Sequence, residues 1–173
     1  MSEKKLEGAG LRGQVAGKTS LSTVGKAGKG LTYRGYPIEV LSEKAKFEEV
    51  AYLLMYGSLP NKDEYENYSS KLMSMRSLPN PILEVLERIP ASAHPMDVMR
   101  TGCSMLGNIE PEGEFSNQQE SADRILATMA SIIVYWYKYS HEGKKVNTSS
   151  DYETIGGHFL SLLPVSYTHL TLP

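Results

Sequence analysis

The sequence predicts an all-α, mainly helical fold with one small β-hairpin near the amino terminus. From residue 37 onwards, apolar residues recur every three or four positions, which is the spacing of helices that bury one face. Proline or glycine ends several of these segments, as expected at helix boundaries. Two short β-prone runs, 21–24 and 31–33, precede them with glycines in between, and this arrangement favours a hairpin.

The helical segments carry local start and stop signals. Asn61 is expected to cap a helix whose first turn is acidic, and Asn80 is expected to cap another with Pro81 at its first helical position. Gly57 is expected to end the segment "KFEEVAYLLMYG", in which four apolar residues share one face: Phe47, Val50, Ala51 and Leu54. We expect about seven helices, over residues 37–41, 47–57, 61–75, 80–89, 95–106, 121–140 and 152–163.

Length and composition fit one globular domain in a reducing compartment. The chain has 173 residues, 40% of them hydrophobic, and a net charge of -2, which excludes a general nucleic-acid or membrane-surface binder. Its longest apolar stretch, 125–137, is shorter than the roughly 20 residues that cross a bilayer. The single Cys103 forms no internal disulfide, and the start "MSEKKLEGAG" lacks a secretion signal. We expect a cytoplasmic protein with no membrane or nucleic-acid partner.

Short catalytic and metal-binding motifs give little support for a function. The "GAGLRG" spacing of a dinucleotide site has no strand before it and no helix after it. No pair of histidines has the spacing of a metal site, so no metal is expected; His94 is placed to cap a helix. The basic residues that could hold an anion are Arg12, Arg34, Lys71, Arg76 and Arg100.

The segment from Met96 to Leu106 has two interpretations. Met96, Met99, Cys103 and Leu106 recur at helical spacing, and the small residues between them would let a neighbouring helix come close. The pattern alone fits an internal core helix. It also fits a helix that packs against a second subunit.

Longer stretches of the sequence are similar to the citrate synthase family. They are "STVGKAGKGLTYRGYPIEVLSEKAKFEEVAYLLMYGSLP", "HPMDVMRTG", "IIVYWYKYSHEG" and "IGGHFL", and the second and third resemble the 2-methylcitrate synthase branch. The resemblance runs from Gly10 to Leu163. It implies part of the large domain of a nearly all-helical homodimer, with the helix Met96 to Leu106 at the subunit interface.

The resemblance also implies a condensation of propionyl-CoA, or acetyl-CoA in an ordinary citrate synthase, with oxaloacetate. The family uses two histidines and an aspartate, and all three belong to segments beyond Leu163, so no catalytic residue is assigned and the chain alone is expected to be inactive. No cofactor is implied, because the CoA thioester is a substrate. Two substrate-binding roles follow from the family: Arg12 in "GLRG" for a CoA phosphate, and Lys71 for a substrate carboxylate.

We therefore divide the chain into three parts. Residues 1–18 are expected to be a flexible segment, and 19–163 the amino-terminal part of a truncated large domain. Residues 164–173 end in "VSYTHLTLP", which a sequencing-library adapter can encode, and are expected to be read-through. The truncation should leave apolar helix faces uncovered and the chain poorly soluble. A different interpretation is a natural non-catalytic module that dimerises through Met96 to Leu106.

Overall fold

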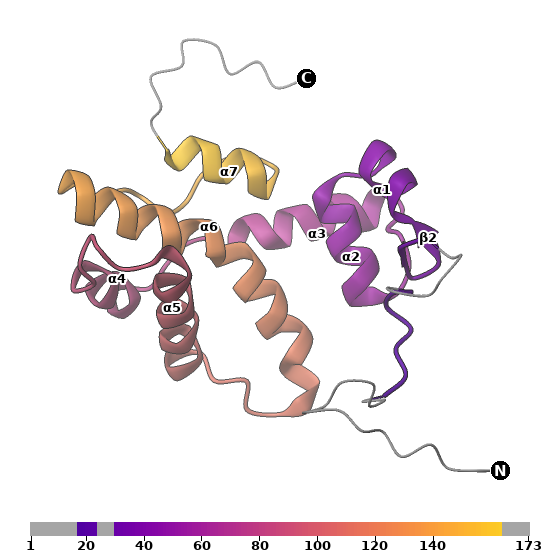
Figure 1. The fold of residues 1–173 in the computed structure, drawn as a ribbon, viewed down its shortest axis with the longest axis horizontal. Coiled ribbons are helices and arrows are strands. Elements are labelled where there is room, and N and C mark those ends of the chain that lie inside the picture. The colour runs from indigo at the N-terminus through magenta and orange to yellow at the C-terminus, as the bar shows by residue number, and fades with distance from the viewer. Residues whose placement is uncertain (1–16, 24–29, 164–173) are drawn as a thin grey trace, which may run out of the picture.

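Helices form nearly all the regular structure of the computed structural model, which describes residues 17–23 and 30–163 (Figure 1). In chain order the elements are β1 (Thr32–Tyr33), β2 (Tyr36–Pro37), α1 (Ile38–Lys44), α2 (Phe47–Tyr56), α3 (Lys62–Ser74), α4 (Asn80–Glu87), α5 (Pro95–Ile109), η1 (Phe115–Asn117), α6 (Gln118–Glu142) and α7 (Ile155–Leu162). The predicted all-α class with a small hairpin is confirmed. Arg12, most of the expected flexible segment 1–18 and all of 164–173 lie outside the described residues.

The hairpin differs from the predicted one in its strands. β1 pairs with β2 in antiparallel register, with Thr32 opposite Pro37 and Tyr33 opposite Tyr36. Arg34 and Gly35 form the turn with φ values of 49° and 91°, and two successive positive φ angles match the right-handed twist of the paired strands. The strand after the turn, rather than residues 21–24, is therefore the hairpin partner.

The predicted strand 21–24 makes a smaller contribution to this β element. Ser22 forms an isolated antiparallel bridge to Tyr33, and the Arg34 amide donates to the Leu21 carbonyl at 2.8 Å. The two β-prone runs also meet at Thr23 and Thr32, where the Thr23 amide donates to the Thr32 carbonyl at 3.3 Å and the Thr32 amide donates to Thr23 Oγ1 at 3.2 Å.

The helix caps follow the local signals at most positions. The Asn61 side chain accepts a hydrogen bond from the Glu64 amide at 3.0 Å, and Gly57 ends α2 with φ of 98°. His94 caps α5, because its Nδ1 accepts from the Met96 amide at 3.2 Å. The predicted N-cap of α4 was wrong by one residue, because Pro79 occupies the N-cap position and Asn80 is the first helical residue. The fixed φ of Pro79 starts the helix without a side-chain cap.

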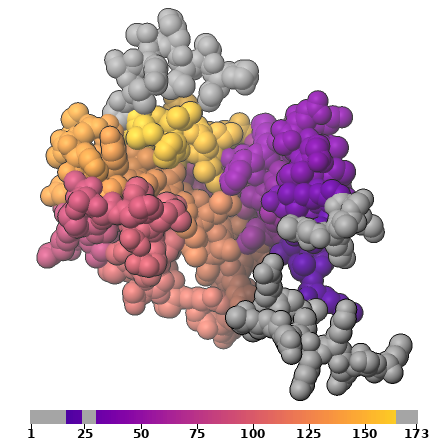
Figure 2. All heavy atoms as spheres, viewed as in Figure 1, coloured from indigo at the N-terminus to yellow at the C-terminus, as the bar shows by residue number. Residues whose placement is uncertain are grey.

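The 25-residue helix α6 is the centre of the fold. It contacts α3, α4, α5 and α7, and Figure 1 shows it running between α1–α3 and the other helices. In Figure 2 the violet α1 and α2 lie on one side of the molecule and the pink α4 and α5 on the other. The main core lies where α4 and α5 meet α6 and contains Leu78, Ile82, Leu86, Val98, Leu106, Ile132, Tyr135 and Trp136.

The contact between α5 and α6 shows which face of α5 packs inside the chain. Val98, Gly102 and Leu106 are buried, and a Cβ on Gly102 would lie 2.6 Å from Cγ2 of Ile132. The small residue therefore admits a helix of the same chain, as the core interpretation expects. Met96 is 63% exposed, so the opposite face of α5 remains open for the predicted subunit contact.

Within the described ranges, no helix combines the length and the apolar character that a membrane crossing requires.

Candidate functional site

Lys71, the predicted substrate contact, lies in a cluster of polar side chains from α2, α3 and α6. Its Nζ is 2.7 Å from Oδ2 of Asp123 and 2.6 Å from Oε2 of Glu120. Asp123 also accepts hydrogen bonds from the Tyr56 hydroxyl at 2.7 Å and the Tyr68 hydroxyl at 2.9 Å. Three donors thus converge on one carboxylate.

The Asp123 carboxylate is completely buried, and its hydrogen bonds shift the pKa values of the side chains that contact it. Burial and the hydrogen bond to Asp123 raise the pKa of Tyr56 to about 12 and that of Tyr68 further above its usual value. Burial alone would lower the pKa of Lys71, but the hydrogen bonds to Asp123 and Glu120 outweigh it and raise that pKa. Lys71 is therefore charged at neutral pH and bound to two carboxylates of its own chain.

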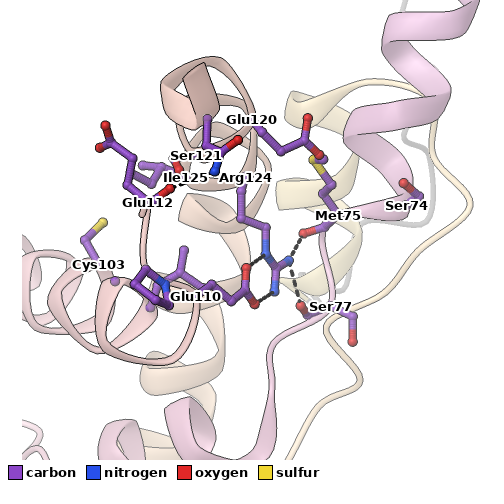
Figure 3. A pocket seen from close by; sticks show the side chains of 14 residues that line it. Ser74, Met75, Ser77, Cys103, Glu110, Glu112, Glu120, Ser121, Arg124 and Ile125 are labelled. Carbon is purple, nitrogen blue, oxygen red and sulfur yellow. Dashed lines mark hydrogen bonds and ion pairs between the residues drawn. The ribbon is translucent and has the colours of Figure 1, made fainter. Parts of the chain in front are cut away.

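A pocket of about 720 Å³ lies beside this cluster (Figure 3). Glu120 belongs to both, since it lines the pocket and pairs with Lys71. At the wall of the pocket, the guanidinium of Arg124 forms two parallel hydrogen bonds of 2.8 Å to the Glu110 carboxylate. The other lining residues are Ser74, Met75, Ser77, Cys103, Leu106, Gly107, Pro111, Glu112, Asn117, Ser121 and Ile125.

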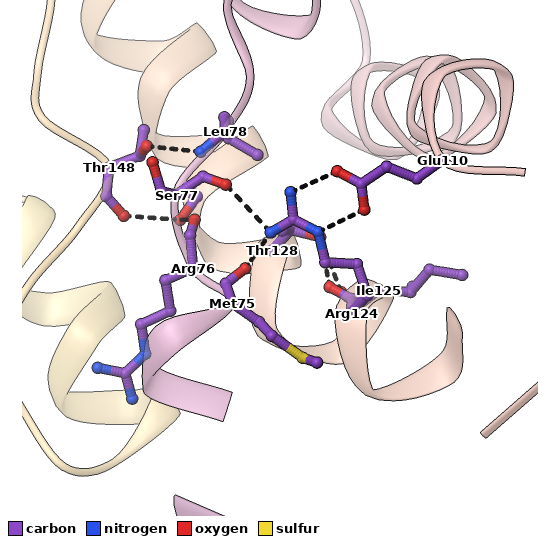
Figure 4. Close-up of polar contacts among 10 residues, drawn as sticks. Met75, Arg76, Ser77, Leu78, Glu110, Arg124, Ile125, Thr128 and Thr148 are labelled. Carbon is purple, nitrogen blue, oxygen red and sulfur yellow. Dashed lines mark hydrogen bonds and ion pairs between the residues drawn. The ribbon is translucent and has the colours of Figure 1, made fainter. Parts of the chain in front are cut away.

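Arg124 also fixes the linker between α3 and α4. Its Nη1 donates to the carbonyls of Met75 and Ser77, the latter at 3.1 Å (Figure 4). The Ser131 hydroxyl donates to the carbonyl of Arg76 in the same linker at 2.8 Å. The linker is thus attached through its backbone to two positions on α6.

Sequence reasoning missed Asp123 and Arg124. They are neighbours in α6, and the predicted start of that helix at residue 121 put Asp123 in its first turn, where a carboxylate is common on a solvated surface. The helix begins at Gln118 instead, so Asp123 lies beyond the first turn and faces the core. The available signal was helical spacing, because Asp123 precedes the apolar Ala127 and Ala130 by four and seven residues and so shares their face.

The other described basic candidates bind groups of their own chain. Arg76 is fully buried and donates to the carbonyls of Tyr152 and Glu153, the latter at 3.1 Å, and burial lowers its pKa. Arg34 donates to Leu54 O at 3.0 Å. Arg100 pairs with Asp97 at 3.1 Å on the surface. Arg76 and Arg34 therefore join distant segments of the fold, the Arg100 pair is local to α5, and Arg12 lies outside the described residues.

The described histidines have structural partners. His158 is buried, with Nε2 2.9 Å from the Ser131 hydroxyl and Nδ1 2.8 Å from the Ser150 hydroxyl. Burial and the charge of Arg76 lower its pKa to about 4. His141 contacts the Ser140 hydroxyl at 2.9 Å and stacks on Tyr137. In the part of the chain that the structure describes, no three His, Cys, Asp or Glu side chains gather as a metal site.

Comparison with known sequences defines the class to which this helical chain belongs. The family model described as citrate synthase, C-terminal domain, matches residues 10–170. The chain belongs to the citrate synthase family, as the resemblance predicted. It is 62% identical over 160 residues to the 2-methylcitrate synthase of Shewanella oneidensis, an alignment that covers 92% of this chain and 43% of that protein. It is 31% identical over 157 residues to 2-methylcitrate synthase 1 of Corynebacterium glutamicum, covering 89% and 41%.

Solved structures agree with this assignment. The citrate synthase of Thermotoga maritima matches with a TM-score of 0.69 and 34% identity, over 80% of this chain and 36% of that chain. A citrate synthase from Thermoplasma acidophilum matches in fold with a TM-score of 0.75 and 18% identity, over 88% and 40%. The chain therefore spans about two fifths of the length of the proteins that it matches.

Proposed function

We propose that this chain is the amino-terminal part of a 2-methylcitrate synthase, a cytoplasmic acyltransferase of propionate breakdown. The reaction joins propionyl-CoA to oxaloacetate with water and gives 2-methylcitrate and CoA. One observation carries the proposal, the 62% identity with the S. oneidensis 2-methylcitrate synthase over 92% of this chain. Lys71 and Arg12 remain the proposed contacts for substrate carboxylate and CoA phosphate.

The chain by itself is proposed to be inactive. A carbon acid as weak as a thioester needs a positioned base and a donor for the enolate oxygen. His94 caps a helix, and both ring nitrogens of His158 contact serine hydroxyls, so neither is free for such a role. The base and donors would come from the part of a synthase that this chain does not span.

A homodimer is proposed through the outer face of α5. This face carries Met96, which is 63% exposed, and the exposed residues Ser104 and Gly107, whose small size favours close helix packing. The alternative of a non-catalytic dimerisation module would use the same face, and it differs from the enzyme proposal only in the absence of turnover.

The acyl preference is tested with a completed chain. Residues 1–163 are fused to the part of the S. oneidensis protein that does not align with this chain, and CoA release is measured with oxaloacetate and each thioester. We expect a higher kcat/KM with propionyl-CoA than with acetyl-CoA, by about 10-fold, because one methylene contributes about 1 to 3 kcal/mol in a pocket.

Two results would overturn the proposal. A higher kcat/KM with acetyl-CoA would make the chain part of an ordinary citrate synthase. No turnover with either thioester, while the intact S. oneidensis protein is active, would favour the non-catalytic module. The 173-residue chain alone serves as the control and should release no CoA.

A further inference from the structure

The apolar face that the sequence predicts for α2 is only partly covered by described residues, among which Tyr68, Leu72 and Ala127 form a buried cluster that Ala51 packs against. Phe47 is 59% exposed, and Val50, Ala51 and Leu54 are partly exposed. The residues of α2 that are fully buried lie elsewhere on the helix: Leu53, and Glu48, whose carboxylate accepts from the Ile155 amide at 2.7 Å. The helix is thus fixed through Leu53 and Glu48, while its apolar face is partly open and is most exposed at Phe47.

This face forms one wall of an open groove of about 750 Å³. Residues of α6, among them Ile125, which is 37% exposed, and residues of α1 also line the groove. Ser42 is the only lining residue whose side chain is neither apolar nor aromatic; the others are Tyr33, Ile38, Leu41, Ala45, Phe47, Val50, Ala51, Leu54, Met55, Ala122, Leu126, Met129 and Ile125.

The composition of the groove identifies the kind of occupant. Small-molecule sites combine apolar walls with a few convergent polar groups that fix orientation, and this groove offers almost none. A continuous apolar surface of this kind instead marks a protein contact, and a trough between helices fits the apolar face of another helix. Because the chain spans 43% of its S. oneidensis relative, more than half of a synthase of that length lies outside the aligned region.

We propose that this groove, lined by α1, α2 and α6, binds an apolar segment from the non-aligning part of a synthase chain, and that it does so even when that part is a separate polypeptide. The proposal rests on the proposed function for the identity of the occupant. The 173-residue chain would then be one half of a complementing pair.

The test is co-expression of the 173-residue chain with an affinity-tagged non-aligning part of the S. oneidensis 2-methylcitrate synthase. The amount of chain that co-purifies with the tagged part is measured for wild type, for the double variant Phe47→Asp/Ile125→Asp, and for Phe115→Asp. Phe47 is the first residue of α2, where an aspartate favours the helix, so the double variant should fold. Phe115 is 82% exposed and does not line the groove, which makes its variant the matched control.

We expect the captured amounts of wild type and Phe115→Asp to agree within 2-fold, and the captured amount of the double variant to be at least 10-fold lower. The helical circular dichroism of all three chains should be equal, which shows that the variants fold. Equal capture of the double variant, or no capture of the wild type, would overturn the proposal. If the chain alone sedimented as a dimer that Phe47→Asp/Ile125→Asp dissociated, a second copy would be the occupant instead. If the chain were captured but the pair released no CoA, the docking proposal would stand and the proposed function would be rejected. If the fusion protein were active but the separate chain were not captured, the proposed function would stand and the docking proposal would be rejected.

Discussion

The Nζ atom of Lys71 lies 2.7 Å from Oδ2 of Asp123, and this ion pair joins α3 to α6 across 52 residues of sequence. Asp123 is completely buried, whereas 31% of the Lys71 side chain is exposed. The two partners therefore differ in what each would lose without the other: the lysine retains Glu120 and water, and the carboxylate retains only two tyrosine hydroxyls.

Replacement of Lys71 alone by methionine should destabilise the fold more than simultaneous replacement of Lys71 and Asp123. Lys71→Met leaves a buried carboxylate without a counter-charge and should lower the free energy of unfolding by about 3 to 5 kcal/mol. Lys71→Met/Asp123→Asn removes that uncompensated charge and should cost less. Urea denaturation of the two variants measures the difference.

Lys62→Met is the control, because Lys62 forms an exposed pair with Glu66 at 3.8 Å and should change stability by at most about 0.5 kcal/mol. If Lys71→Met/Asp123→Asn were less stable than Lys71→Met, the unpaired buried carboxylate would not be the cause of the stability lost in Lys71→Met.

The glycines of α5 should respond in opposite directions to alanine. At Gly102 a Cβ would lie 2.6 Å from Ile132 Cγ2, so Gly102→Ala should destabilise by about 1 to 3 kcal/mol through overpacking. At Gly107 a Cβ would meet nothing of the same chain within 4 Å, so Gly107→Ala should stabilise the monomeric chain by about 0.5 to 1 kcal/mol through helix propensity. Thermal unfolding of both variants checks the signs. Equal changes in stability for Gly102→Ala and Gly107→Ala would contradict the close approach of α5 to α6 at Gly102.

The sequence predicted those features of the fold that depend on neighbouring residues. Asn61, Gly57 and His94 act where local cap and stop patterns put them, because each needs only backbone groups a few positions away. The α4 cap was misplaced because Pro79 and Asn80 are both acceptable starting residues. The hairpin was misassigned because the Arg34–Gly35 turn depends on two positive φ angles that no short β-prone run reveals.

The candidate site was less predictable, for a physical reason. Lys71 was recognised from its family position, but its two carboxylate partners both come from α6, and nothing in the local pattern of α3 specifies them. In the same way, the apolar face of α2 could be read from its periodicity, while its exposure depends on which other segments are present to cover it. Local spacing determines which residues share a face, but long-range packing determines what that face contacts.

Arg124 should not tolerate replacement by lysine. The guanidinium binds both oxygens of Glu110 and reaches two carbonyls of the α3–α4 linker, whereas an ammonium group cannot reproduce the planar fork. Arg124→Lys should therefore lower stability by about 1 to 3 kcal/mol. The change in melting temperature measures this loss.

The control for Arg124 is Arg100→Lys. Arg100 is 77% exposed in its pair with Asp97, so its replacement should cost at most about 0.5 kcal/mol. If both replacements lowered the melting temperature equally, the linker contacts of Arg124 would contribute nothing to stability.

His158 should make the stability of the fold depend on pH between about 6.5 and 4. Burial, assisted by the charge of Arg76, lowers its pKa to about 4, whereas an unfolded chain has a histidine pKa of about 6.5. Between these values the unfolded chain binds a proton that the folded chain does not, so the folded state loses stability as the pH falls through this window. From pH 7.5 to pH 5 the loss amounts to about 2 kcal/mol. His158→Gln removes the titrating group and keeps an amide beside Ser131 and Ser150. Urea denaturation at several pH values should give a flatter dependence for His158→Gln than for the wild type, and parallel curves would show that His158 is not held in its neutral form by burial.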